Sequence, residues 1–114
     1  MKASVVVSRV YQLLGDLGTT RLYNEAKDVI PAIAAAQRAF FVDRPDCRMA
    51  TGNTWPEITD PTESTSDMII DAAFTEAVSN QAAFVLLTTK ARTKLDSAGS
   101  QKFRDAYLVA IGAK

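Results

Sequence analysis

The chain contains no histidine, and this absence narrows the chemistry available to its 114 residues. Histidine is the commonest acid–base catalyst near neutral pH and a frequent ligand of zinc and copper. Without it a Ser/His/Asp triad cannot be assembled, and the sequence shows neither a phosphate-binding glycine loop nor a cluster of metal ligands. We therefore expect a protein that is not an enzyme and that needs no cofactor or metal.

Cysteine is almost absent as well, because Cys47 is the only one. A single cysteine excludes an intrachain disulfide and is typical of a reducing compartment. Since no histidine can activate its thiol, we interpret Cys47 as a buried or incidental residue. Asp43 with Asp46, and Asp67 with Asp71, are paired carboxylates that we interpret as helix-end residues rather than as catalytic acids.

Long uncharged apolar runs are also missing from the sequence. Ser8, Arg9 and Gln12 interrupt the apolar residues near the start, so this region does not resemble a secretory signal, and no stretch is long enough to span a bilayer. We expect a soluble protein that is made in the cytoplasm and makes no membrane contact. A domain of this length buries roughly two-thirds of its unfolded surface, which suffices for a core without metals or disulfides.

The net charge is zero, but the charges are unevenly distributed. Residues 1–56 carry +2, residues 57–89 carry −6 with no basic residue, and residues 90–114 carry +4. One interpretation is that acidic and basic residues complement the dipole of a long helix. The other is that the two blocks of neighbouring copies meet in a head-to-tail assembly. The predicted interface residues are Glu57, Asp60, Glu63, Asp71 and Glu76 in the acidic block, and Lys90, Arg92, Lys94, Lys102 and Arg104 in the basic block.

A long helix over residues 67–89 is the centre of the predicted fold. Ser66 or Asp67 is its candidate N-cap, and Ser64 to Asp67 fits a capping box. Residues 82–87 are apolar on every side, so we expect this part of the helix to be buried all round. The residues that recur at the helical period are Ile70, Ala73, Phe74, Ala77, Val78, Phe84 and Val85.

A first helix is predicted near the start of the chain, with Ser4 as its cap. Three consecutive valines at 5–7 leave a strand start open. Gly15 or Gly18 ends the helix, because glycine readily takes the left-handed conformation of a C-cap. Its apolar side consists of Val6, Val10, Leu13 and Leu14.

A second helix is predicted to run to about Val42, and two starts stay open. Either Asp28 caps a helix from Val29 with Pro31 in its first turn, or one helix from Asn24 bends at Pro31. Its apolar side consists of Ile30, Ile33, Ala34, Phe40 and Phe41.

Residues 45–66 form the predicted irregular segment. Short strands at 47–51 and 55–58 around a turn are one interpretation of it. Ser100 caps a last helix that carries Phe103, Tyr107, Ala110 and Ile111 on one side. The predicted fold class is therefore all-α, a four-helix antiparallel bundle with a short irregular or β-hairpin-like excursion between the second and third helices, in a single domain over residues 1–114.

Trp55 is the only tryptophan and lies in the irregular segment. It either packs the segment onto the helices or anchors a partner, and with Arg48 and Ile58 it makes a predicted partner-contact loop. The basic residues of 90–104 do not indicate a specific DNA site, because no aromatic stacking platform is interleaved with them.

Short motifs along the chain, taken in order, resemble a known family. The first half has Gly15-Asp16, then Arg21-Leu22-Tyr23-Asn24, then Ala35-Ala36-Gln37-Arg38-Ala39 and Arg44-Pro45-Asp46. The second half has Ile69-Ile70-Asp71, an Ala-rich stretch with Glu76-Ala77-Val78 and Ala82-Ala83-Phe84, and Phe103, Tyr107 and Ile111 before Gly112. In this order the motifs resemble the small head–tail adaptor, or head-completion, proteins of tailed bacteriophages. Tyr23 stands where many relatives have tryptophan, and residues 47–66 are short beside the insertions that some relatives carry.

The resemblance implies a structural virion protein, assembled in the host cytoplasm and located at the head–tail interface. Such proteins form a homo-oligomeric ring, usually dodecameric, that binds the portal protein, continues the DNA channel and offers a platform for a tail or tail-adaptor protein. It also implies non-specific contact with DNA in the channel, governed by salt. The alternative is a non-phage helical interaction or scaffold module that homo-oligomerises.

Overall fold

A computed structural model describes residues 2–16, 23–48, 60–70, 72–89 and 99–112. Helices dominate these ranges, which confirms the all-α prediction, and the β-pairing within them is an isolated bridge between Lys2 and Asp67. The α-helices are α1 (Ala3–Leu14), α2 (Ile30–Asp43), α3 (Thr75–Thr89) and α5 (Gln101–Ala110). A π-helical turn η1 (Glu25–Val29) precedes α2, and the 3₁₀ turns are η2 (Pro45–Arg48) and η3 (Ala72–Phe74).

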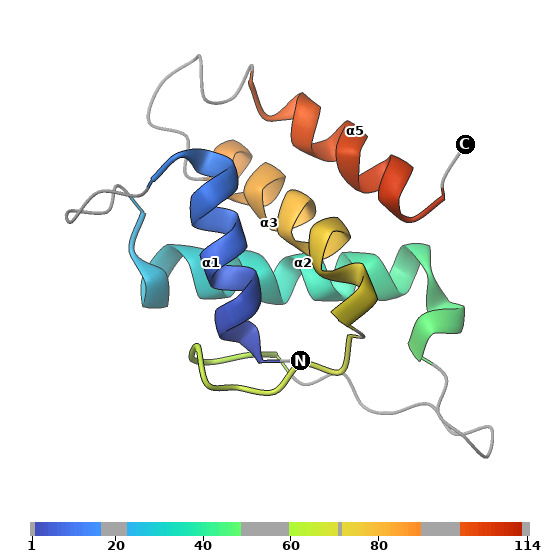
Figure 1. Cartoon of the computed structure of the whole chain (residues 1–114), viewed down its shortest axis with the longest axis horizontal. Coiled ribbons are helices and arrows are strands. Elements are labelled where there is room, and N and C mark those ends of the chain that lie inside the picture. The colour runs from blue at the N-terminus through green and yellow to red at the C-terminus, as the bar shows by residue number, and fades with distance from the viewer. Residues whose placement is uncertain (1, 17–22, 49–59, 71, 90–98, 113–114) are drawn as a thin grey trace.

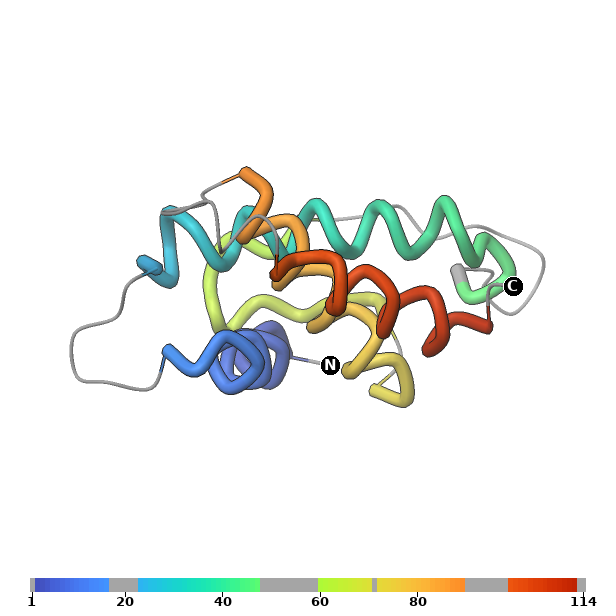
Figure 2. The backbone as a smooth tube through the Cα atoms, turned by 90° about the horizontal axis from the view of Figure 1, so that it is seen from above, coloured from blue at the N-terminus to red at the C-terminus, as the bar shows by residue number. Residues whose placement is uncertain are grey.

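Helix α3 is central to the arrangement (Figure 1). It packs against α1, α2 and α5, whereas α1 crosses α2 and meets it only along a short length (Figures 1 and 2). Within residues 82–87 the buried side chains are Ala82, Ala83, Leu86 and Leu87, and Phe84 and Val85 are half-buried. The prediction that this part of the helix is buried all round is thus confirmed for Ala82, Ala83, Leu86 and Leu87 and is wrong for Phe84 and Val85.

Helix α3 begins at Thr75 rather than at the predicted Asp67. Residues 67–70 are not helical: Asp67 makes the isolated bridge with Lys2, and Met68 and Ile70 are buried while Ile69 between them is 37% exposed. Alternation with a period of two is typical of extended chain, and it brings both apolar side chains into the core without a helix. The prediction of a helix over residues 67–70 is therefore wrong.

The residues before η3 do not cap α3. They supply main-chain acceptors for the free amides at the start of α1. The main-chain amides of Ala3 and Ser4 donate to the carbonyls of Ser66 and Ser64, at 2.9 and 2.8 Å. Ser66 Oγ accepts hydrogen bonds from the amides of Thr62 and Glu63. The predicted side-chain caps at Ser4 and at Ser66 or Asp67 are wrong, because main-chain carbonyls take up the free amides at the start of α1 and α3 starts later.

Helix α1 ends at a glycine, as predicted. Gly15 has φ +71°, in the left-handed region. The amides of Gly15 and Asp16 donate to the carbonyls of Gln12 and Tyr11, at 3.2 and 3.0 Å, so they close the last turn. Gly18, the other candidate, lies outside the described residues. The buried face of α1 consists of Ala3, Val6, Val7, Val10 and Tyr11, while Leu13 and Leu14 are half-buried.

The start of α2 combines parts of both predicted starts. The Asn24 side chain accepts from the amide of Lys27, and the Asp28 side chain accepts from the amide of Asn24, at 2.9 and 2.8 Å. Asn24 is therefore the cap, and the prediction that Asp28 caps a separate helix is wrong. The turn η1 leads directly into α2, where Pro31 lies in the first turn and its missing amide proton costs little.

The irregular segment 45–66 is described in part. The amide of Cys47 donates to the carbonyl of Arg44 at 3.1 Å and belongs to η2, so the strand predicted from Cys47 does not begin there. The remainder of both predicted strands, residues 49–51 and 55–58, lies outside the described residues.

Helix α5 begins after Ser100, as predicted, and the carbonyl of Ser100 accepts from the amide of Phe103 at 3.0 Å. The Ser100 side chain makes no capping hydrogen bond, so the predicted side-chain cap is wrong. Phe103, Tyr107 and Ile111 are buried together in the core, whereas Ala110, assigned to the same side, is exposed. The core therefore draws on all four helices and on the residues before α3.

Candidate functional site

The predicted acidic surface is divided between two elements. Asp60 and Glu63 lie in the segment before α3, Glu76 lies in the first turn of α3, and all three are exposed. Glu57 and Asp71 lie outside the described residues.

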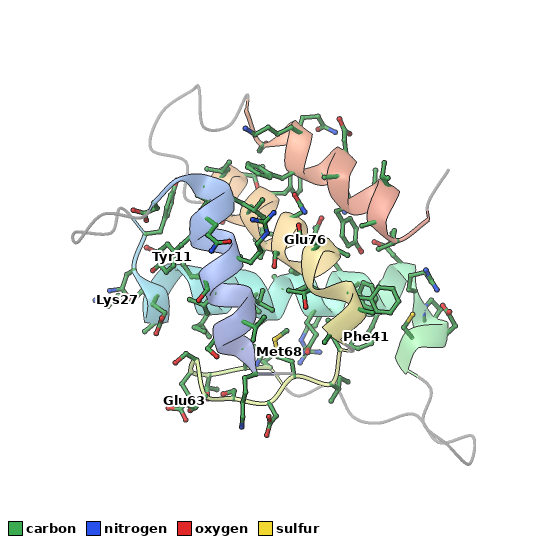
Figure 3. All side chains as sticks on the ribbon, in the orientation of Figure 1. Tyr11, Lys27, Phe41, Glu63, Met68 and Glu76 are labelled. Atoms are coloured by element: carbon green, nitrogen blue, oxygen red, sulfur yellow. The ribbon has the colours of Figure 1, made fainter. Side chains whose placement is uncertain are left out.

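The acidic side chains have partners within their own chain. Arg38 Nε donates to Asp60 Oδ1 at 2.8 Å. Arg9 of α1 holds both oxygens of Glu76 on α3, with Nε at 2.6 Å and Nη2 at 3.1 Å (Figure 3). The hydrogen bond that Arg9 donates to Glu76 raises the pKa of Arg9 above its ordinary value. The described ion pairs of the acidic block are therefore made with basic residues of 1–56.

These ion pairs are exposed and therefore exchangeable. The side chains of Arg9 and Glu76 are 37% and 59% exposed, and those of Arg38 and Asp60 are 53% and 45% exposed. Pairs this open to water are worth about 0–1 kcal/mol each. The carboxylates can accordingly change partner at small cost when another charged surface approaches.

Arg104, in the predicted basic surface, is directed into the contact between α5 and α3. Its Nη1 donates to Gln81 Oε1 at 2.9 Å. Its guanidinium lies 5.1 Å from the ring centroid of Tyr107 and 5.8 Å from that of Phe84. Arg104 is thus partly buried within the subunit, which the linear spacing of basic residues does not reveal.

Lys102 is the exposed member of the basic surface on α5. Its ammonium lies 5.0 Å from the ring centroid of Phe103, which is within the range of a cation–π contact. The other basic residues of the predicted surface lie outside the described residues: Lys90, Arg92 and Lys94.

The predicted partner-contact loop is described only at its start. Arg48 is the last residue of η2, and Trp55 and Ile58 lie outside the described residues. Cys47 is half-buried, with its Sγ 3.8 Å from Asp46 Oδ2.

A cluster that we did not predict joins the end of α2 to the end of α5. Arg44 donates through Nε and Nη2 to both oxygens of Asp46, at 3.1 and 3.0 Å, and through Nη1 to the carbonyl of Ile111 at 2.8 Å. The Tyr107 hydroxyl donates to Asp43 Oδ2 at 2.5 Å. We call Asp43, Arg44, Asp46, Tyr107 and Ile111 the clasp. The Arg-Pro-Asp motif marks the end of α2 in the sequence, but nothing local indicates that Arg44 reaches a carbonyl 67 residues away.

The charges of the clasp support its hydrogen bonds. Burial, and then the hydrogen bond to Asp43, raise the pKa of Tyr107, so its hydroxyl stays protonated and donates. The Arg44 guanidinium lowers the pKa of Asp46, and the hydrogen bond that Arg44 donates to Asp46 raises the pKa of Arg44. The positive side chain at the Ile111 carbonyl also complements the negative end of α5. The clasp is therefore a charged contact that fastens the last helix.

In the part of the chain that the structure describes, no group of three histidine, cysteine, aspartate or glutamate side chains is placed to hold a metal ion. None of the described helices combines the length and the apolar character that crossing a membrane requires. The predicted site residues that the structure describes lie on exposed surfaces or in contacts between helices.

Comparison with protein-family models, curated proteins and solved structures gives no match to this chain. The resemblance to head–tail adaptors therefore depends on the sequence motifs alone. Where those motifs lie in the fold is the information that the structure adds.

Proposed function

We propose that this protein is a structural virion subunit that assembles into a ring, joins the portal of a phage capsid to the tail and continues the DNA channel. The observation that carries the proposal is the placement of the resemblance motifs, because those described lie at helix boundaries or in contacts between distant segments. This placement supports a common fold with the head–tail adaptor proteins rather than a chance set of short sequence matches.

The Gly15-Asp16 motif and the Tyr23 motif contact each other. Asp16 is buried, and its Oδ2 accepts a hydrogen bond from the Tyr23 amide at 3.1 Å. The Tyr11 hydroxyl donates to the Tyr23 carbonyl at 2.8 Å, so the turn after α1 is tied at both polar groups of the Tyr23 main chain. A glycine–aspartate turn followed by an aromatic residue thus has a defined structural role in this fold.

Two further motifs lie on α2 and at its end. Gln37, in the Ala-Gln-Arg motif, is fully buried on α2, and Arg38 beside it pairs with Asp60. Arg44 and Asp46 belong to the clasp. These side chains determine how the helices are joined, which is what a structural subunit requires of residues that define its shape.

Size under native conditions tests the proposal. Native mass spectrometry and negative-stain electron microscopy of the purified protein, alone and mixed with portal protein, are expected to show a closed ring or a complex with the portal. A discrete dimer that does not bind portal favours the alternative, a helical scaffold module. Contact with DNA is expected to weaken with added salt whatever the base sequence.

Charge reversal tests the interface that the proposal uses. Changing Lys90, Arg92 and Lys94 to Glu is expected to abolish ring assembly, because the basic block then repels the acidic block of the neighbouring copy. Circular dichroism is expected to show an unchanged helix content. Ring assembly that survives this reversal contradicts the pairing.

A double reversal serves as the control. Changing Lys2 and Lys27 to Glu alters the net charge outside the basic block by the same amount as changing Lys90 and Lys94 to Glu within it. Lys27 lies at the outer edge of the molecule, and Lys2 makes an exposed ion pair with Asp67 (Figure 3). Assembly is expected to persist in this variant, and its loss in both variants would trace the effect to net charge instead.

A further inference from the structure

Helix α5 is attached to the molecule differently from the other helices. Its helix packing is against α3, and its remaining described attachment is the clasp at its far end. Figure 1 shows it as an outer layer over α3, on the side away from α2. It contributes three side chains to the core, namely Phe103, Tyr107 and Ile111.

The contact between α5 and α3 includes polar as well as apolar side chains. Gln81 on α3 is 5% exposed, and Arg104 of α5 engages it with a hydrogen bond. On the opposite side of α5, Val109 is 78% exposed. Water can replace the polar contacts when the helix leaves, so the loss of apolar burial is confined to a few side chains.

The rest of the core is continuous without α5. Val6 and Val10 of α1, Ile33 and Phe40 of α2, and Leu86 of α3 are all fully buried. The residues before η3 add Met68 and Ile70 to the same cluster. The three helices α1, α2 and α3 therefore retain a shared apolar core when α5 is removed from it.

We propose that α5 is a separately opening unit, latched to the end of α2 by the clasp, that leaves α3 while α1, α2 and α3 stay folded. Proteins open in cooperative units of unequal stability, and a unit with few buried apolar contacts opens first. Tyr107 is the latch, because its fully buried ring packs in the core while its hydroxyl reaches the exposed Asp43. The proposal concerns the single subunit and does not depend on ring assembly.

Native-state hydrogen exchange on the full chain tests the proposal. Amides of residues 105–111 are expected to exchange through an opening of lower free energy than the amides in the middle of α1, α2 and α3. In low concentrations of denaturant, this opening is expected to depend weakly on denaturant, since it exposes little surface. Exchange of the α5 amides only through global unfolding would overturn the proposal.

The variant Tyr107→Phe tests the latch. It removes the hydroxyl and keeps the ring, and the loss of a hydrogen bond to a charged acceptor is expected to accelerate exchange in α5 by about 10-fold. Exchange in the middle of α1, α2 and α3 is expected to change much less. An equal acceleration of all amides, or none in α5, would overturn the role of the clasp.

Two further variants complete the test. Tyr11→Phe is the matched control, because it removes a buried tyrosine hydroxyl that bonds to a carbonyl before α2, and α5 exchange is expected to keep its rate. Arg44→Gln is expected to accelerate α5 exchange as Tyr107→Phe does, while Arg38→Gln, which breaks an exposed pair elsewhere, is expected to leave it unchanged. Acceleration of α5 by the two controls to the same extent would overturn the proposal.

Discussion

Helices α3 and α5 show two ways in which a helix joins the same core. Nine of the fifteen residues of α3 are buried, against two of the ten residues of α5. Helix α3 is therefore covered by other helices on several sides. Helix α5 is held by one apolar side and by the hydrogen bonds of the clasp. A helix of the first kind holds the fold together, and one of the second kind can be exchanged or released.

The burial of α3 includes polar residues as well as apolar ones. Ser79, Asn80 and Gln81 are consecutive and all buried. Asn80 Nδ2 donates to the carbonyl of Glu76 at 2.8 Å, and Gln81 accepts from Arg104, whereas Ser79 Oγ has no hydrogen-bond partner among the described residues. These three polar side chains are therefore buried because this turn of α3 lies between the other helices.

Shortening an aliphatic side chain in each helix gives the largest expected difference. Leu86→Ala is expected to lower the free energy of unfolding by about 2–5 kcal/mol, because Leu86 is fully buried on α3 and a cavity remains. Val109→Ala on the exposed side of α5 is expected to change it by less than about 0.5 kcal/mol. Urea unfolding followed by circular dichroism measures both, and equal losses would contradict the contrast between the helices.

Removing the unpartnered hydroxyl of α3 is expected to stabilise the protein. Ser79→Ala is expected to raise the free energy of unfolding by about 1 kcal/mol, since it removes a desolvated polar group and improves helix propensity. The control Ser8→Ala, at an exposed position of α1, has the propensity gain alone. Thermal and urea unfolding of the pair measure the difference, and a loss of stability in the Ser79 variant would show that its hydroxyl has a partner.

The ion pair between α1 and α3 is expected to contribute less. A double-mutant cycle with Arg9→Gln and Glu76→Gln is expected to give a coupling free energy of about 0.5 kcal/mol, because both side chains are partly exposed. The coupling is expected to fall in 1 M salt, which screens exposed charges. Coupling well above 1 kcal/mol would mean that this pair is a main support of α3.

The smallest expected effect is a dependence of the clasp on pH. Arg44 lowers the pKa of Asp46 below its unfolded value of about 3.9, so the stabilisation is present above that pH and is lost as the pH falls through the folded pKa. Asp46→Asn removes this contribution. The two proteins are expected to differ in α5 hydrogen exchange at pH 6 and to converge in acid, after correction for intrinsic exchange rates. A difference that grows in acid contradicts this sign.

The apolar alternation at Met68, Ile69 and Ile70 shows why part of the fold could not be predicted. Ile70 fits one face of a helix with a period of 3.6 when it is read with Ala73 and Phe74. Met68 and Ile70 equally fit a non-helical stretch in which every second residue is buried, and the structure has this second form. The choice depends on pairing with residues 2–4, which are distant in the sequence.

In the candidate surface too, the sequence shows the distribution of charge but not the partners that are distant along the chain. The uneven distribution of charge is visible in the sequence, and the exposure of Asp60, Glu63 and Glu76 agrees with it. Their partners in the folded chain were not foreseen, since Arg9 and Glu76 are separated by 67 residues. Arg104 was assigned to the surface but lies against Gln81 and Tyr107, because the packing of α5 on α3 brings it there.

The sequence by itself determined that the protein is helical, that a glycine ends α1, and that Phe103, Tyr107 and Ile111 face inwards, and it offered Asn24 as one of two candidate starts before α2. These features follow from glycine stereochemistry, side-chain capping and helical periodicity, which act over a few neighbouring residues. Only the tertiary structure decided where α3 begins, which charges are paired, and that Arg44 and Asp43 latch α5. Those outcomes depend on which segments pack together, and many local patterns are compatible with more than one packing.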